Sequence, residues 1–362
     1  MVSYIENDLQ PKLTKSEAQI ESKGINLPAS WYIAMQSVEL DKKPIAIELF
    51  GRALVAWRDK DRKAVIMERF CSHVGASLAI GEVVDGCIQC PFHHWRYDHS
   101  GVCVHIPKVA TPHTDHIPST ARQKTYVTEE RYGYIWVWYG TATPLFDLPK
   151  FDAAESNKHK YIPYRFSIMV QTNVRRIIEN SCDHHHLVTI HDMQVNDSVK
   201  LTVLDEKDVE LSELPIAKEA WMGFIVEARI KTFLGVRGIT KALGLNVETM
   251  STRADLWPSG ILATTKLDGQ ERLVVLDTVT PISENQTNWQ VLIMVNKTGN
   301  LFLDLLSYIV FGWQGRANGF ADKLLFDNMS ADTGRAFIKC DQPVLKFRQF
   351  YQSWVNKAQS NK

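Results

Sequence analysis

Two short pairs of cysteine and histidine offer four metal ligands in the first hundred residues of the chain. Cys71 and His73 form a C-x-H pair, Cys90 and His93 form a C-x2-H pair, and sixteen residues separate the two pairs. This spacing suits two adjacent loops. Because thiolates and imidazoles bind zinc and iron, the four residues predict a metal site.

Two kinds of metal centre can use this ligand set. A 2Fe-2S cluster can carry two cysteines on one iron and two histidines on the other, which raises its reduction potential to roughly −150 to +300 mV. A structural zinc accepts the same ligands in a tetrahedral site. Zinc-finger patterns, however, usually keep the cysteines in one pair and the histidines in the other, whereas each pair here is mixed. The mixed pairs favour the 2Fe-2S cluster.

Neighbouring residues offer alternatives to this assignment. Cys87 and Cys90 form a C-x2-C motif, which in another context indicates a redox dithiol, but that motif would leave the other three ligands unexplained. We therefore expect Cys87 and Cys103 to be buried structural thiols. His94 could compete for the iron, although the C-x2-H spacing favours His93.

A second group of candidate ligands lies between residues 179 and 191, in the sequence ENSCDHHHLVTIH. Asp183, His186 and His191 form D-x2-H-x4-H, in which the first two would be neighbours on one face of a helix. His191 would lie about 140° further around an ideal helix, so the helix must end or widen between the two histidines. Two histidines and one carboxylate form the facial triad of non-haem Fe(II) oxygenases.

The histidine run by itself is also compatible with a solvated surface segment, because three consecutive side chains cannot all point one way. The Cys-His pairs elsewhere in the chain favour metal binding, with His184 and His185 outside the coordination shell. All twelve histidines lie at or before His191, so a third ligand from further along the chain must be Asp or Glu.

The first motif resembles the Rieske domain of ring-hydroxylating and related non-haem iron oxygenases. The resemblance extends through Cys71-Ser72-His73, the string CPFHHWRY at 90–97, Gly101-Val102-Cys103 and Ile106-Pro107. It is greatest for the branch that contains the 3-ketosteroid 9α-hydroxylase oxygenase component and the cholesterol 7-desaturases. It implies an α+β chain with an N-terminal all-β Rieske domain, followed by a helix-grip catalytic domain with an antiparallel sheet and helices.

The resemblance also implies roles for individual residues. The segment DKLLFDN at 322–328 resembles the string that carries the family's iron carboxylate, which indicates Asp322 as the third ligand, with Asp327 as the alternative. In that family the carboxylate at the position of Asp183 bridges the two metal centres across a subunit boundary. Asp183 would then connect a cluster histidine of one chain to an iron ligand of the next, within a head-to-tail homotrimer.

The elements that must position these ligands follow from the residue patterns. We expect a loosely helical arm at 1–28, the Rieske domain at 29–145 and the catalytic domain at 146–362. Apolar segments at Ala53–Trp57 and Ala64–Met67 predict a hairpin in the first domain. In the second domain, Asp268-Gly269 predicts a hairpin, and a helix follows Gly299.

Composition excludes several classes of partner. Lys+Arg and Asp+Glu both number 41, and no basic stretch offers the electrostatic footprint of nucleic-acid or anionic lipid binding. The N-terminal residues lack the features of a signal or transit peptide, so we expect a cytoplasmic protein without a transmembrane segment. The apolar run Leu301–Trp313 is shorter than the ~20 residues of a membrane span, which predicts a buried helix.

These features together predict a terminal oxygenase that uses O2, a Rieske 2Fe-2S cluster and a mononuclear Fe(II). The chain has no G-x-G-x-x-G fingerprint, so NAD(P)H can serve only through a separate flavin reductase, a ferredoxin or both. The resemblance implies monooxygenation of a hydrophobic substrate, polycyclic or alicyclic. Tyr, Trp and Phe of the second domain would form an apolar pocket, and we expect the segment from about 201 to 255 to line or cover it. The alternatives are oxidative N- or O-demethylation and, in another class, electron transfer without oxygenase activity.

Overall fold

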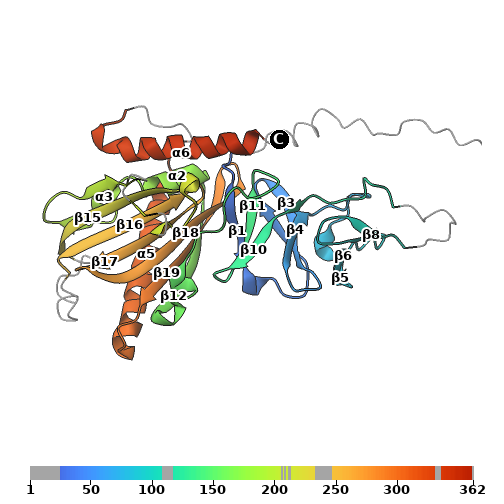
Figure 1. The fold of residues 1–362 in the computed structure, drawn as a ribbon, viewed down its shortest axis with the longest axis horizontal. Helices are drawn as coiled ribbons and strands as arrows, with labels where there is room; N and C mark the ends of the chain where they lie inside the picture. Colours follow the sequence, from blue (N-terminus) through green and yellow to red (C-terminus); the bar gives the residue numbers. More distant parts are fainter. Residues whose placement is uncertain are drawn as a thin grey trace, which may run out of the picture.

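The computed structural model describes residues 25–107, 117–204, 207, 209–210, 213–232, 247–330 and 336–360. Most of the predicted arm at 1–28 lies outside these residues. Figure 1 shows an elongated molecule with the small strands of the N-terminal half at one end and one large sheet at the other.

Within residues 25–107 and 117–139, the N-terminal half forms three small antiparallel sheets. The first contains β1 (Ser30–Gln36), β11 (Tyr134–Tyr139) and β10 (Thr128–Arg131). The second contains β2 (Ile45–Leu49), β3 (Arg52–Arg58), β4 (Ala64–Glu68) and β9 (Thr125–Tyr126). The third contains β5 (Glu82–Val84), β6 (Cys87–Gln89), β7 (Arg96–Tyr97) and β8 (Cys103–His105).

The hairpin predicted in this half is confirmed by the antiparallel pairing of β3 and β4. Its turn is held by the Asp59 carboxylate, which accepts hydrogen bonds from the backbone amides of Asp61 and Lys63 at 2.9 Å each. Such local bonds favour a turn over continued strand. The end of β4 leads directly into the loop that carries Cys71.

The C-terminal half is built on an eight-stranded antiparallel sheet. Its main path runs in the order β12-β19-β18-β17-β16-β15-β13, and β14 pairs with β15. The strands are β12 (Tyr161–Val170), β13 (Gln194–Val195), β14 (Lys200–Val203), β15 (Met222–Thr232), β16 (Thr249–Trp257), β17 (Gly260–Leu267), β18 (Gln270–Ser283) and β19 (Gln286–Asn296). Asp268 and Gly269 have φ values of +48° and +78°, as the predicted two-residue hairpin requires. The α+β expectation is confirmed.

One long helix, α5 (Leu301–Phe326), packs against β12 and β19. The Asn300 side chain caps its start by accepting from the amides of Phe302 and Leu303. A Cβ at Gly312 would lie 2.6 Å from the Tyr164 ring, so glycine permits this close approach of helix and sheet. The helix thereby carries its C-terminal residues along the sheet.

The expectation of a buried helix at Leu301–Trp313 is wrong in part. The segment is helical, but Leu301 is 88% exposed and Trp313 is 66% exposed. Only the face that meets the sheet is covered, because a helix on a sheet buries one stripe. No described helix is long and apolar enough to cross a lipid bilayer.

The described residues of the C-terminal half form three further α-helices: α2 (Val174–Asn180), α3 (His186–Thr189) and α6 (Gln342–Gln359). Figure 1 shows α6 running along one side of the large sheet, next to α2, with which it makes contact. One hydrophobic cluster includes Leu54 and Ile135 from the N-terminal half and Val279 from β18. The two halves therefore share a core, and the domain boundary near residue 145 stays a prediction.

Candidate metal centres and substrate cavity

The two loops that carry the Cys-His pairs have the same backbone hydrogen-bond pattern. The Cys71 amide donates to the Ala76 carbonyl, and the Gly75 amide donates to the Cys71 carbonyl, both at 2.9 Å. In the second loop the Cys90 amide donates to Trp95 at 2.8 Å and the His94 amide to Cys90 at 3.1 Å.

This repeated pattern bears on the choice between His93 and His94. Gly75 and His94 occupy the same place in their loops, and both have positive φ, +77° and +56°. His94 thus lies at the turn position that glycine fills in the other loop. The His93 ring, in contrast, lies 4.7 Å from the ring of His73, which favours His93 as the ligand. The assignment stays a prediction.

The four proposed cluster ligands converge with the cysteines inside and the histidines outside. Cys71 and Cys90 are buried in one core cluster, whereas His73 and His93 are exposed and their ring centroids lie 4.7 Å apart. Two sulfur ligands on one side and two imidazoles on the other fit a 2Fe-2S cluster with one iron of each type.

Two aromatic residues contact the proposed cluster ligands. The Tyr97 hydroxyl lies 3.0 Å from Cys71 Sγ and 2.9 Å from Ser72 Oγ. The His73 ring stacks on Trp95 with centroids 4.3 Å apart and planes 4° apart. These contacts fix the orientation of both ligands of the first pair, which is the role that outer-shell residues play at metal sites.

The structure places the second candidate site where one short helix ends. His186 is the first residue of α3, and His191 follows two residues after the end of that helix at Thr189. The expected end of the helix between the two histidines is therefore present. Asp183, however, lies in the turn between α2 and α3 and not on one continuous helical face with His186.

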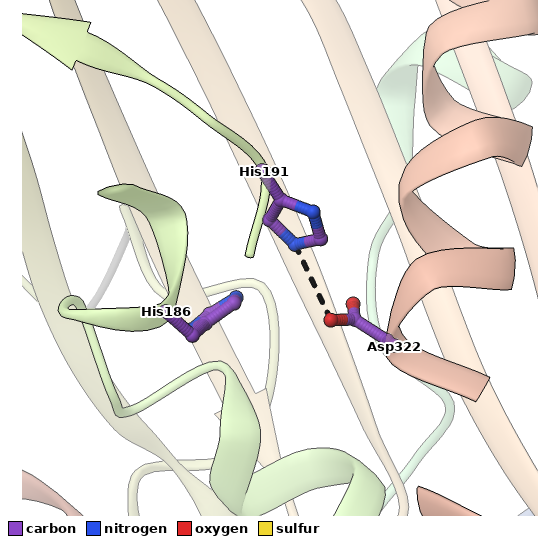
Figure 2. A group of neighbouring side chains, drawn as sticks. All are labelled: His186, His191 and Asp322. Carbon is purple, nitrogen blue, oxygen red and sulfur yellow. Dashed lines mark ion pairs between the residues drawn. The ribbon is translucent and has the colours of Figure 1, made fainter. Parts of the chain in front are cut away.

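His186, His191 and Asp322 come together across α3, the following loop and α5. Their ligand atoms all lie within 4.8 Å of one another, and His191 Nε2 is 3.4 Å from Asp322 Oδ1. Figure 2 shows the two imidazoles and the carboxylate pointing toward a common point. The Nδ1 of His186 hydrogen-bonds the backbone carbonyl of Asp183, which leaves Nε2 as the free ring nitrogen.

This arrangement fits a bound cation. Asp322 is 5% exposed, and its Oδ1 has no hydrogen-bond partner among the described residues. His191 Nδ1 is likewise buried without a partner there. A buried carboxylate without a donor is costly, and a metal ion would compensate it. Burial also lowers the pKa of His186, which favours the neutral imidazole that binds metals.

The alternative carboxylate, Asp327, makes other contacts. Its Oδ1 accepts from the Gln171 amide at 2.7 Å, and its Oδ2 pairs with Lys323. Asp327 is the C-terminal cap of α5, beyond the turn that faces the histidines. The geometry thus favours Asp322 as the third ligand.

Asp183, the proposed bridging residue, is half-buried. Its Oδ1 accepts a hydrogen bond from the His185 amide at 2.9 Å, at the start of α3. Its side chain therefore helps to hold the turn that presents His186.

A cavity of about 550 Å³ adjoins the three converging side chains. Its volume is in the usual range for small-molecule sites. Aromatic side chains from four elements contribute to its wall, namely Phe166, Phe224, Trp289 and Phe311.

The expectation that residues between 201 and 255 line the cavity holds for part of that range. The lining residues there come from β15 and β16 and are Phe224, Val226, Ile230, Met250, Thr252 and Ala254. Residues 233–246 lie outside the described chain.

Further lining residues lie outside that range, on β12, α2, β17, β18, β19 and α5. Among them the acid Asp277 was not anticipated. The signal in the sequence was the alternation Leu273, Val275, Asp277, Val279, in which an acid interrupts an apolar row.

Sequence comparison identifies two family domains in the chain. The Rieske [2Fe-2S] domain matches residues 30–126, and the 3-ketosteroid 9alpha-hydroxylase C-terminal domain matches residues 135–354. The aminopyrrolnitrin oxygenase of Pseudomonas fluorescens is 41% identical over 341 residues, which covers 93% of each chain. The oxygenase component of 3-ketosteroid-9-alpha-monooxygenase from Rhodococcus rhodochrous is 31% identical over 42% of this chain and 39% of its own.

Solved structures share the fold over nearly the whole length. Dicamba monooxygenase bound to 3,6-dichlorosalicylic acid superposes with a TM-score of 0.71 at 18% identity, over 92% of this chain and 98% of the other. The Pseudomonas putida CBB5 protein NdmA, solved with caffeine, gives a TM-score of 0.69 at 19% identity, over 90% and 94% of the two chains.

Proposed function

Because this chain belongs to the Rieske non-haem iron oxygenases with a 3-ketosteroid 9α-hydroxylase type of catalytic domain, we propose that it hydroxylates an apolar small molecule with O2. The observation that carries the proposal is the 550 Å³ cavity directly beside His186, His191 and Asp322. It provides a largely apolar binding space next to a candidate metal site with the ligand types of a facial triad.

The two metal centres of this family have proposed ligands in the chain. Cys71, His73, Cys90 and His93 would hold the 2Fe-2S cluster, and His186, His191 and Asp322 would hold the mononuclear iron. When bound, the cluster supplies single electrons and the iron supplies open coordination positions for the reaction with O2. The residues of the cavity bind and orient the substrate and exclude water.

Electron transfer between chains is supported by the shape of the molecule. Figure 1 shows that β6, which leads into the Cys90 loop, lies at the opposite end of the molecule from α3, the helix that begins at His186. A second chain that brings its cluster loops to Asp183 would shorten the path. We propose a head-to-tail homotrimer in which Asp183 hydrogen-bonds a cluster histidine of its neighbour.

The electrons come, in this proposal, from NAD(P)H through a separate flavin reductase, a ferredoxin or both. The exposed imidazoles of His73 and His93 offer a contact for such a donor.

The proposed substrate has an apolar body of several rings. The cavity wall supports this class, and the relatives' names refer to aminopyrrolnitrin, a 3-ketosteroid and cholesterol. Oxidative demethylation is the alternative outcome of the same chemistry, since hydroxylation of an N- or O-methyl group is followed by loss of formaldehyde.

The test combines metal analysis with product analysis. Purified chain should contain about three iron atoms, two from the cluster and one mononuclear; about two would support an electron carrier. With a surrogate reductase and ¹⁸O2, mass spectrometry of products from a panel of polycyclic compounds should detect labelled hydroxyl groups. Labelled product is the supporting result, whereas formaldehyde release would indicate demethylation.

The bridging residue has its own test. Asp183→Ala should retain both metals but lose turnover, because the electron path is interrupted. If this variant formed product at the full rate with electrons from the reductase, the bridging role would be disproved.

A further inference from the structure

Two acidic side chains that line the cavity, Asp192 and Asp277, are not proposed metal ligands. Asp192 lies in the loop after α3, next to His191, whereas Asp277 lies within the large sheet. Asp277 lies on β18 between Ile261 of β17 and Val291 of β19, its partners in register. All three residues line the cavity. A carboxyl group thus stands in the middle of an apolar wall.

Only one of the two oxygens of the Asp277 carboxyl group has a hydrogen-bond partner among the described residues. Trp289 Nε1 donates a hydrogen bond to Asp277 Oδ1 at 3.2 Å. No further hydrogen bond and no ion pair reaches the Asp277 side chain from the described residues. The Asp277 side chain borders the cavity, so a bound ligand can reach it.

Four other polar side chains of the cavity wall form two hydrogen-bonded pairs. The hydroxyls of Thr252 and Thr265 lie 3.0 Å apart, and Gln314 Nε2 donates to Asn318 Oδ1 at 2.7 Å. Asp277 differs from these four residues because one of its two oxygens remains available to a ligand.

Within the described residues, the Asp277 carboxyl group has no hydrogen-bond donor besides the Trp289 ring. The pKa of this carboxyl group is raised to about 7, mainly by burial; the Trp289 hydrogen bond opposes the rise and the negative charge of Asp322 adds to it. No positively charged side chain compensates it within the described residues. A ligand group that brings N–H hydrogens would supply the missing donor.

We propose that Asp277 is a specificity-determining residue that accepts a hydrogen bond from an amino group on an otherwise apolar, aromatic substrate. The contact orients the substrate relative to His186, His191 and Asp322, which line the same cavity. A site built to bond a polar substituent discriminates against the analogue that lacks it, because its own polar group is then left unpaired. This inference rests on the proposed function, since it assumes that the cavity binds the substrate.

The test uses three probes of one shape, namely 4-aminobiphenyl, biphenyl and 4-methoxybiphenyl. Their dissociation constants are measured by equilibrium dialysis against the iron-loaded protein. The amine should bind about tenfold or more tightly than biphenyl. The methoxy compound, which has an acceptor but no donor, should resemble biphenyl.

Two variants separate recognition from folding. Asp277→Leu should bind amine and hydrocarbon with equal affinity, while Asp277→Asn, which keeps an acceptor oxygen and a similar shape, should retain part of the preference. Glu284→Gln removes a carboxylate from the exposed turn after β18 and should leave the preference unchanged. Iron content and circular dichroism confirm that each variant is folded.

The outcomes distinguish this inference from the proposed function. Equal affinity of the unmodified protein for amine and hydrocarbon, including no binding of either, would overturn the role of Asp277. So would a Leu variant that keeps the preference, or tight binding of the methoxy compound. If the amine preference depends on Asp277 but no labelled product forms from any compound, the oxygenase proposal fails and the recognition site stands.

Discussion

At the scale of single residues, the contacts around the Cys-His loops determine how the proposed cluster is tuned. Tyr97 is buried, and its hydroxyl reaches both Cys71 Sγ and Ser72 Oγ. A hydrogen bond to a ligand sulfur stabilises the reduced cluster, because reduction adds negative charge to the sulfur atoms.

Tyr97→Phe should therefore lower the reduction potential of the cluster. A hydrogen bond worth about 0.5–1.5 kcal/mol corresponds to a decrease of roughly 20–60 mV for a one-electron couple. A redox titration followed by electron paramagnetic resonance measures the shift. Tyr126→Phe is the control, since that phenol contacts Glu68 and none of the proposed ligands; an unchanged potential in Tyr97→Phe would contradict the role assigned here.

A second prediction at this scale separates the two candidate iron carboxylates. Asp322→Ala should reduce the iron content from about three to about two atoms per chain and abolish product formation, because the facial triad loses its only carboxylate. Asp327→Asn should keep about three, since its oxygens contact Gln171 and Lys323. Iron analysis of both purified variants decides the matter, and the reverse pattern would assign the ligand to Asp327.

At the scale of elements, a buried charge network connects α2 to α6. Glu179 on α2 accepts from Arg176 Nη1 at 3.1 Å, and from Arg348 Nε and Nη2 on α6 at 2.8 and 3.0 Å. Glu179 is only 5% exposed. Because α2 leads directly into the turn that holds Asp183, this network fixes the position of the proposed bridging residue.

Glu179→Gln should lower the free energy of unfolding by about 3 kcal/mol, because the buried guanidinium of Arg176 and the partly buried guanidinium of Arg348 lose their counter-charge. Urea denaturation measures the difference. Glu227→Gln is the matched control, since its pair with Lys200 spans 3.7 Å between exposed side chains, and the change there should be about 0.5 kcal/mol or less. Equal losses in the two variants would show that burial of the network adds nothing.

At the scale of the whole molecule, the separation of the two ends makes the assembly testable. Cys90→Ser should disable the cluster and His186→Ala the iron site, so each variant alone should be inactive. In co-expressed mixtures, about a quarter of the head-to-tail interfaces would join an intact cluster to an intact iron site. Product formation by the mixture therefore measures transfer between chains.

The control mixes Cys90→Ser with the double variant Cys90→Ser/His186→Ala, which contains no intact cluster and should stay inactive. Light scattering should give the mass of three chains for the active mixture. An inactive trimer in the first mixture would place electron transfer within one chain and remove the proposed role of Asp183.

The sequence alone was sufficient for features that depend on local spacing. Residue types at fixed intervals predicted the Cys-His loops, the end of the helix between His186 and His191, and the hairpin at Asp268-Gly269, because each depends on a few neighbouring residues. The family resemblance was also sufficient to choose Asp322 for testing. The Rieske cluster, the oxygenase class and the α+β fold are confirmed by the family matches.

Only the tertiary structure decided which distant residues meet. The approach of Asp322 to the two histidines depends on how α5 packs along the sheet, and the exposure of Leu301 depends on which face of that helix the sheet covers. The sequence shows Asp277 only as an acid within a strand, whereas the structure places it among apolar residues of the neighbouring strands, beside the cavity. Burial and the free space beside a side chain arise from the packing of segments far apart in the chain, and no local pattern encodes them.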